Sequence, residues 1–289
     1  MNRINLMKLI LVLTFCLASI FCFAQTDTTA TSVSPKKNTL TLAAIYANDA
    51  SYYGQKAAQQ TPYVAAAVVY QLKSGFYFTG QSYKLLKDNT SSVSAGAVGA
   101  GINFMMGKKL ETDLSYSHSF YPSYSPLLQA VNADNATLAF SVDSLWIKPK
   151  LTLDYAFGKT NDAFATAAIS KSVNLFSITP KDIVTIEPAA SVVGGTQHFY
   201  QTYITQKKIH DNALGLPIPG LGNSGSTSST DTVRTTDFNV LSYNFTIPLA
   251  YNRAHYLVQA EYQVSLLSNH VAANKQINSF LTFSFYYQF

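Results

Sequence analysis

The most constraining feature of the sequence is the alternation of side chains over residues 279–289. The positions of one parity are aromatic or aliphatic: Leu281, Phe283, Phe285, Tyr287 and Phe289. The other parity is mostly polar and carries Thr282, Ser284 and Gln288. Successive side chains of a β-strand point to opposite faces, so a strand here has one apolar face and one mostly polar face. We interpret it as a membrane-spanning strand that closes a barrel.

This ending resembles the C-terminal assembly signal of Gram-negative outer-membrane β-barrel proteins, which end in Phe after alternating apolar residues. The resemblance implies that the protein lies in the cell outer membrane, in contact with its lipid, and that barrel-assembly machinery inserts it. The residues of the implied signal are Leu281, Phe283, Phe285, Tyr287 and Phe289. The resemblance indicates a location and a fold, and it does not indicate an activity.

The same alternation recurs in about twelve segments between residues 38 and 289. It is clearest over 110–120, where Leu110, Leu114 and Phe120 alternate with Glu111 and Asp113. An open sheet edge cannot face hydrocarbon, because each unpaired N–H or C=O costs several kcal/mol there. The first and last strands must therefore pair.

The connections between these segments alternate between brief and extended. The brief ones lie near 73–75, 107–109, 148–150, 175–182 and 250–254, and the others near 49–61, 87–91, 121–135, 158–162, 206–235 and 267–278. Bacterial barrels combine short periplasmic turns with longer outer loops and an even number of strands. The sequence therefore predicts an all-β fold, a transmembrane antiparallel up-and-down β-barrel of about 12 strands, with 10 or 14 as alternatives.

The beginning of the chain is typical of a secretory signal peptide. Arg3 and Lys8 precede an apolar run of about 15 residues, shorter than the ~20 that a spanning helix needs. We expect residues 1–24 to be cleaved, with an uncleaved anchor as the alternative. The polar segment 25–37 is then predicted to be a flexible periplasmic tail, and 38–289 the barrel.

Composition excludes several classes of site. Only 12% of the residues are charged, against about 25% in a typical soluble domain. Both cysteines, Cys16 and Cys22, fall in the predicted signal peptide, so disulfides and thiolate metal sites are excluded from the mature chain. Loss of Arg3 and Lys8 leaves 18 basic against 15 acidic residues, too small an excess to indicate a nucleic-acid partner.

Four acidic residues, Glu111, Asp113, Asp154 and Glu261, lie on the parity opposite the apolar side chains and are the lumen-facing candidates. Glu111 and Asp113 could bind a cation, although a solvated lumen wall also accounts for this pair. Asp154 and Glu261 could instead pair with a basic residue across the lumen. In the segment around residues 97–106 the same parity carries Ala97, Gly99, Gly101 and Asn103, whose small side chains leave room for water or for a plug.

The histidines do not indicate catalysis. Lipid-A deacylases and outer-membrane phospholipases resemble one another in using a His and a Ser two residues apart on one strand face. None of the five histidines, His118, His198, His210, His255 and His270, has Ser two residues later. We therefore expect no catalytic residue, no cofactor and no bound metal.

The resulting expectation is a passive pore or channel-like barrel. One alternative is a structural or interaction barrel that presents the loop 206–235 to another envelope protein. The other alternative, an outer-membrane enzyme, is disfavoured by the missing His/Ser spacing.

Overall fold

The structure is a computed structural model, and it describes residues 37–57, 59–88, 92–123, 125–142, 146–199, 237–271 and 276–289. The predicted signal peptide (1–24), all of the predicted tail except Lys37, and the predicted loop 206–235 lie outside these residues and stay predictions. In the described ranges, no helix is both long enough and apolar enough to cross a membrane.

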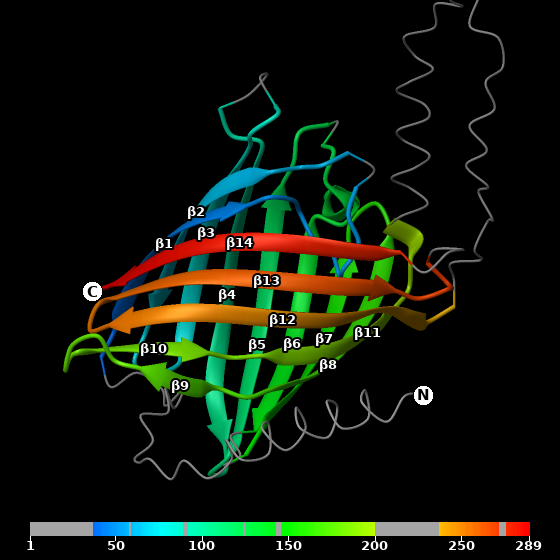
Figure 1. Cartoon of the computed structure of the whole chain (residues 1–289). Helices are drawn as coiled ribbons and strands as arrows, with labels where there is room; N and C mark the ends of the chain where they lie inside the picture. Colours follow the sequence, from blue (N-terminus) through cyan, green and yellow to red (C-terminus); the bar gives the residue numbers. More distant parts are fainter. Residues whose placement is uncertain are drawn as a thin grey trace, which may run out of the picture. The chain divides into compact units, whose positions relative to one another are not determined.

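Fourteen strands are defined within the described part of the chain (Figure 1). They are β1 (Thr39–Ala47), β2 (Tyr63–Gln71), β3 (Phe76–Leu85), β4 (Ala95–Met106), β5 (Leu110–Phe120), β6 (Asp134–Val142), β7 (Lys148–Phe157), β8 (Asn161–Ser170), β9 (Val173–Phe176), β10 (Asp182–Ile186), β11 (Ala189–Gly195), β12 (Asn239–Arg253), β13 (Tyr256–Leu267) and β14 (Ile277–Gln288). A short 3-10 helix, η2, covers Leu128–Val131 between β5 and β6.

These fourteen strands make twelve passes. β8 and β9 form one pass that is interrupted at residues 171–172, and β10 and β11 form another that is interrupted at Glu187 and Pro188. The long strand β12 pairs with β10 over one part of its length and with β11 over the rest. A register shift between Val193 and Gly194 bends the second pass further. Pro188, which has no backbone N–H to donate, lies in the interruption between β10 and β11, and Gly194 lies at the register shift.

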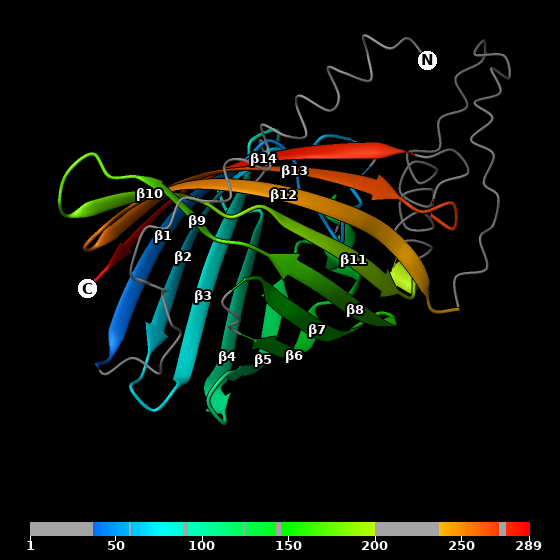
Figure 2. The ribbon, with the colours of Figure 1, turned by 60° about the horizontal axis from the view of Figure 1, so that its bottom comes forward.

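The sheet closes on itself. Each pass pairs antiparallel with the passes before and after it in the sequence, and β1 pairs with β14 from Thr41↔Gln288 to Ala47↔Thr282. Figures 1 and 2 show the strands encircling a common axis. The predicted fold, an antiparallel up-and-down barrel of 12 passes, is confirmed.

The barrel has two different ends. We call the end with the short connections, together with Lys37 and Phe289, the turn end, and the opposite end the loop end. Three predicted short connections are displaced: residues 148–150 belong to β7, β12 continues to Arg253, and the connection after β9 covers 177–181. Pro149 is tolerated inside β7 because the ladder between β6 and β7 begins only at Lys150. The missing N–H of Pro149 therefore removes no hydrogen bond to β6.

The outer wall is apolar. Large exposed side chains such as Leu42, Phe78, Leu114 and Tyr155 point outward from strands around the whole circumference. Phe283, Phe285 and Phe289 of the predicted assembly signal belong to the same outer wall, and Leu281 and Tyr287 share their parity. A closed ladder with an apolar exterior is what a barrel in hydrocarbon requires. The chain therefore forms a membrane-spanning barrel, in agreement with the predicted location in the outer membrane.

Candidate functional site

The connection between β1 and β2 folds into the loop end of the barrel, and we call its residues 48–57 the plug. Its tip is a tight turn in which Tyr52 and Gln55 exchange both backbone hydrogen bonds, at 2.8 and 3.0 Å. Tyr53 and Gly54 both have positive φ, 52° and 83°. Glycine is required at 54 because a Cβ there would lie 2.6 Å from Asn244 Oδ1. The tip therefore touches the inner face of β12.

Two wall side chains hold the backbone of this tip. Ser242 Oγ on β12 donates to the Tyr53 carbonyl at 2.8 Å, and Asn278 Nδ2 on β14 donates to the Gly54 carbonyl at 2.9 Å. Both wall residues are almost completely buried. The chain continues from the plug into β2, but the plug tip itself contacts β12 and β14.

The rings of the plug pack on the far wall. Tyr53 stacks on Phe164 of β8 with ring centroids 3.9 Å apart, and Tyr52 meets Phe164 and Phe199 edge-on at 5.8 and 4.9 Å. Burial raises the pKa of both tyrosine hydroxyls, and nearby carboxylates, Asp162 for Tyr52 and Asp154 for Tyr53, raise it further. Both rings therefore stay neutral at physiological pH.

The base of the plug is closed by the buried carboxylate of Asp49. Its Oδ1 accepts hydrogen bonds from the Thr61 backbone N–H (2.8 Å), the Thr61 hydroxyl (2.9 Å) and the Ala50 N–H (3.0 Å). Asn48 Oδ1 accepts from the Leu281 N–H at 2.8 Å, which ties the same point to β14. The two ends of the β1–β2 connection are therefore held together where they leave the wall.

Two apolar clusters cross the loop end. One comprises Leu128, Val131, Ala156, Phe164, Val193, Phe199 and Leu241, with Tyr52 and Tyr53 packed against it. The other comprises Leu85, Ala95 and Leu127, with Ala50 and Ala130 among its neighbours. Residues 127–131 contribute to both, so the clusters reach from β3 and β4 on one side to β8 and β12 on the other. Apolar packing between the plug and the connections therefore spans the inside of the barrel at the loop end.

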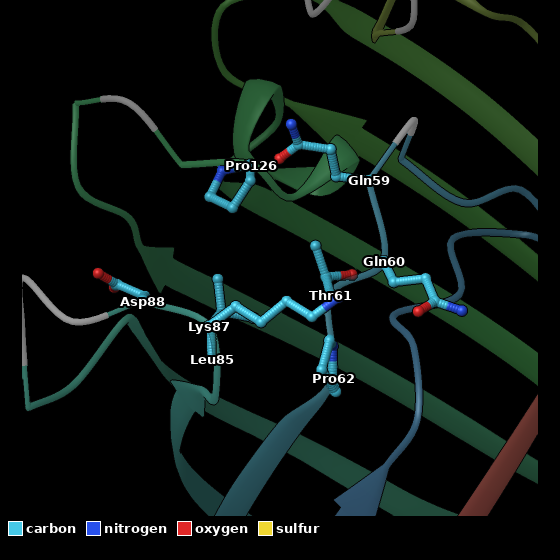
Figure 3. Close-up of a pocket in the computed structure, with 8 residues that line it drawn as sticks. All are labelled: Gln59, Gln60, Thr61, Pro62, Leu85, Lys87, Asp88 and Pro126. Atoms are coloured by element: carbon cyan, nitrogen blue, oxygen red, sulfur yellow. The ribbon is translucent and has the colours of Figure 1, made fainter.

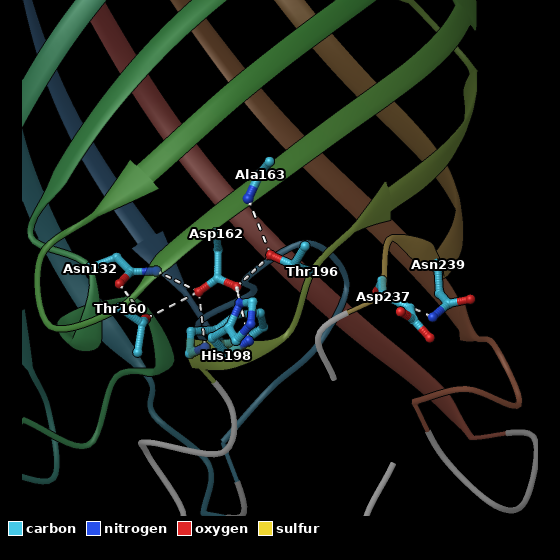
Figure 4. Close-up of polar contacts among 9 residues, drawn as sticks. Asn132, Thr160, Asp162, Ala163, Thr196, His198, Asp237 and Asn239 are labelled. Carbon is cyan, nitrogen blue, oxygen red and sulfur yellow. Dashed lines mark hydrogen bonds and ion pairs between the residues drawn. The ribbon is translucent and has the colours of Figure 1, made fainter. Parts of the chain in front are cut away.

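Asp162 is the polar anchor of this assembly (Figure 4). It has no solvent exposure. Its carboxylate accepts from the backbone N–H groups of His198 and Phe199 at 2.9 Å each, and from Thr196 Oγ1 at 2.6 Å. Asn132 Nδ2 donates to it at 2.8 Å from the β5–β6 connection. One β8 carboxylate thus holds two connections against the plug.

The remaining lumen wall toward the turn end is polar. Glu111 accepts from Asn103 Nδ2 at 2.7 Å and from Ser141 Oγ at 3.0 Å, and the Lys148 ammonium lies 3.8 Å away. Asp113 accepts from the Tyr77 hydroxyl at 2.9 and 3.0 Å to its two oxygens. The structure places both carboxylates of this predicted pair on the inner face, each with its own set of donors.

The small residues of β4 serve packing at this level. Tyr77 on β3 lies opposite Gly101, and a Cβ on Gly101 would be 2.4 Å from the Tyr77 ring. The ring therefore crosses β4 over the glycine, so its hydroxyl reaches Asp113 on β5. This glycine makes room for a neighbouring side chain.

The other two candidates lie on other parts of the wall. Thr137 Oγ1 donates to Asp154 at 2.6 Å, and Asn135 Nδ2 lies 3.4 Å from the same oxygen. Glu261 on β13 accepts from Gln259 Nε2 at 3.3 Å. The four predicted residues are thus distributed along the inner wall, and only Glu111 and Asp113 are neighbours.

Three histidine rings have partners other than serine. His118 Nδ1 lies 2.7 Å from Asp134 on the outer wall, His198 Nδ1 lies 3.1 Å from Asp162, and His255 Nδ1 lies 3.2 Å from a backbone carbonyl. Within the described residues, no group of three or more His, Cys, Asp or Glu side chains could hold a metal ion. His210 lies outside them.

A pocket of about 420 Å³ opens beside the second limb of the plug connection (Figure 3). Gln59, Gln60 and Thr61 form one side, and Lys87 and Asp88 at the end of β3 form another. Thr61 also holds Asp49, so this pocket adjoins the base of the plug.

The sequence did not single out Tyr52, Tyr53, Asp162, Ser242 or Asn278. One signal was available. Next to the turn-forming residues Asn48, Asp49 and Gly54, the chain carries two adjacent tyrosines, which is unusual for a fully solvated loop. The wall partners could not be found in this way, because β12 and β14 lie about 190 and 220 residues from the plug.

The sequence matches no protein-family model, and no curated protein matches it significantly. Solved structures of similar fold include the KdgM porin (8% identity, TM-score 0.48, 86% of this chain and 99% of that chain). They also include an outer membrane channel from Pseudomonas putida F1 (11%, 0.43, 92% and 100%) and LpxR from Salmonella typhimurium (9%, 0.44, 86% and 99%). At these identities and TM-scores the likeness carries no functional argument.

Proposed function

We propose that the protein is an outer-membrane channel whose lumen is closed by the plug and conducts when the plug leaves the wall. The observation that carries the proposal is a polar inner wall beneath a plug tip, residues 52–55, that makes no ladder bond between β1 and its neighbours. β1 pairs with β2 and β14 through its strand residues, and Asn48 at the base of the plug bonds to Leu281 of β14. The plug tip can therefore move while the barrel stays closed.

The contacts of the plug tip support a stable but reversible closure. Two hydrogen bonds from Ser242 and Asn278 and the ring contacts of Tyr52 and Tyr53 hold the tip. A net hydrogen bond contributes about 0.5–1.5 kcal/mol and an aromatic pair a similar amount. If the closed state is more stable than the open state by a few kcal/mol, openings are rare, since each 1.4 kcal/mol changes the ratio of the two states about tenfold.

Single-channel recording in a planar bilayer tests the proposal. We define the plug-release variant as Tyr52→Ser combined with Tyr53→Ser, which removes both rings and keeps the chain length. We expect wild type to open rarely and the variant to raise the open probability by roughly tenfold or more, because its ring contacts are lost.

The matched control is Tyr70→Ser with Tyr155→Ser, which removes two tyrosines from the outer wall. It should leave the open probability close to that of wild type. Folding of each sample is checked by gel mobility before and after heating. Folded barrels that never conduct, with or without the plug rings, would refute the channel.

A further inference from the structure

The inner wall between the plug and the turn end carries an excess of negative charge. Four carboxylates lie on it, Glu111, Asp113, Glu187 and Glu261, and a fifth inner-face carboxylate, Asp154, lies beside Tyr53 of the plug. Two lysines, Lys148 and Lys150, share the inner parity of β7. Building on the proposed function, we propose that this wall makes the channel select cations over anions.

The carboxylates are spread around the lumen. They come from β5, from β7, from β13 and from the break between β10 and β11, where Glu187 accepts from Ser170 Oγ at 2.9 Å. A solute that passes along the lumen therefore meets acidic groups on several sides. Rings of Asp and Glu side chains are the arrangement that favours cations in pores.

Neutral donors hold most of these carboxylates. Hydroxyl groups of Tyr77, Thr137 and Ser170 bind Asp113, Asp154 and Glu187, and an amide group of Gln259 binds Glu261. Such donors orient a carboxylate without cancelling its charge. Glu111 forms an ion pair with Lys148, whose ammonium lies 3.8 Å away. The net field in the lumen is therefore negative.

The surroundings strengthen this field. The wall is a single layer of protein with lipid behind it, and low-dielectric walls focus the field of lumen charges onto the solution inside. At about 0.1 M salt the screening length is about 10 Å, so charges on opposite sides of a narrow lumen act on the same ion. The same charges repel anions.

The test is the reversal potential of the plug-release variant under a tenfold KCl gradient. We expect a K⁺ permeability severalfold above that of Cl⁻. The preference should shrink as both solutions approach 1 M KCl, because the screening length falls to about 3 Å. A permeability ratio at or below one in the dilute gradient would overturn the inference and leave the channel itself standing. Absence of conductance from folded barrels would instead remove the proposed function.

Charge-neutral variants locate the effect. In the plug-release background, Asp154→Asn with Glu261→Gln should move the permeability ratio toward one. The matched control is Asp134→Asn, which removes a carboxylate that bonds Tyr116 and His118 on the outer wall. An equal change in the control would contradict the assignment. The plug-release variant alone already gives the sign of the preference, so the test does not depend on the folding of the amide variants.

Discussion

Asp162 shows how much one side chain contributes to the loop end. It is a carboxylate without solvent exposure, and its cost of burial is offset by donors from Asn132, Thr196 and two backbone N–H groups. Hydrogen bonds to a charged group contribute about 1.5–3 kcal/mol each, and an unpaired buried donor is costly. Its role depends on segments about 30 residues away on either side, so the sequence alone did not indicate it.

We predict that Asp162→Asn lowers the free energy of unfolding by about 3 kcal/mol, because the amide group faces donors that lose their acceptor. Guanidinium unfolding of the protein in lipid vesicles measures this. The control is Asp237→Asn, the same chemical change at an exposed residue near the same end (Figure 4). A similar loss in both variants would show that Asp162 does not anchor the plug assembly.

At the scale of elements, β3, β4 and β5 act as one packed unit. Tyr77 crosses β4 over Gly101 and binds Asp113, so the three strands are coupled through their inner face as well as through their backbone ladders. The sequence predicted the three strands and the small residues of β4 but left open whether these residues made room for water or for protein. At Gly101 the space is filled by protein, because the ring of Tyr77 lies over the glycine.

We predict that Gly101→Ala destabilises the folded barrel by about 1–3 kcal/mol, because its Cβ would force Tyr77 away from Asp113. The control is Gly96→Ala on the same strand, whose Cβ would have its nearest neighbour, a backbone oxygen, at 3.6 Å. Equilibrium unfolding in lipid vesicles compares the two variants. Combining Gly101→Ala with Tyr77→Ala should restore part of the free energy of unfolding that Gly101→Ala removes. If the double variant restored none of it, the contact with the Tyr77 ring would not be the cause of the destabilisation.

At the scale of the whole molecule, closure defines two environments. Side chains of one parity face outward on every pass, and the β1–β14 pairing leaves no edge between the first and last passes. The part of the outer wall that lies in hydrocarbon, midway between the two ends, must therefore exclude charge, whereas the lumen accepts it.

We predict that Leu153→Arg, on the outer wall midway along β7, costs about 2–4 kcal/mol in lipid vesicles, since Arg would enter the hydrocarbon. Thr152→Arg, its neighbour on the inner face, should cost much less because its side chain enters the lumen. Unfolding titrations in vesicles give both values. Equal costs would show that the two faces are wrongly assigned.

The amino-acid sequence by itself determined the barrel: its antiparallel strands, its two unlike ends and which side chains face lipid. It predicted about twelve strands and left 10 or 14 open. These follow from local alternation and connection length, because a strand sorts its side chains by parity and hydrocarbon permits no open edge. Only the tertiary structure decided that the plug packs against the inner wall, because it binds Ser242, Phe164 and Asn278, which are remote in the sequence. Nothing in the local pattern of either partner specifies such a contact, so it became visible only once the sheet had curled into a barrel.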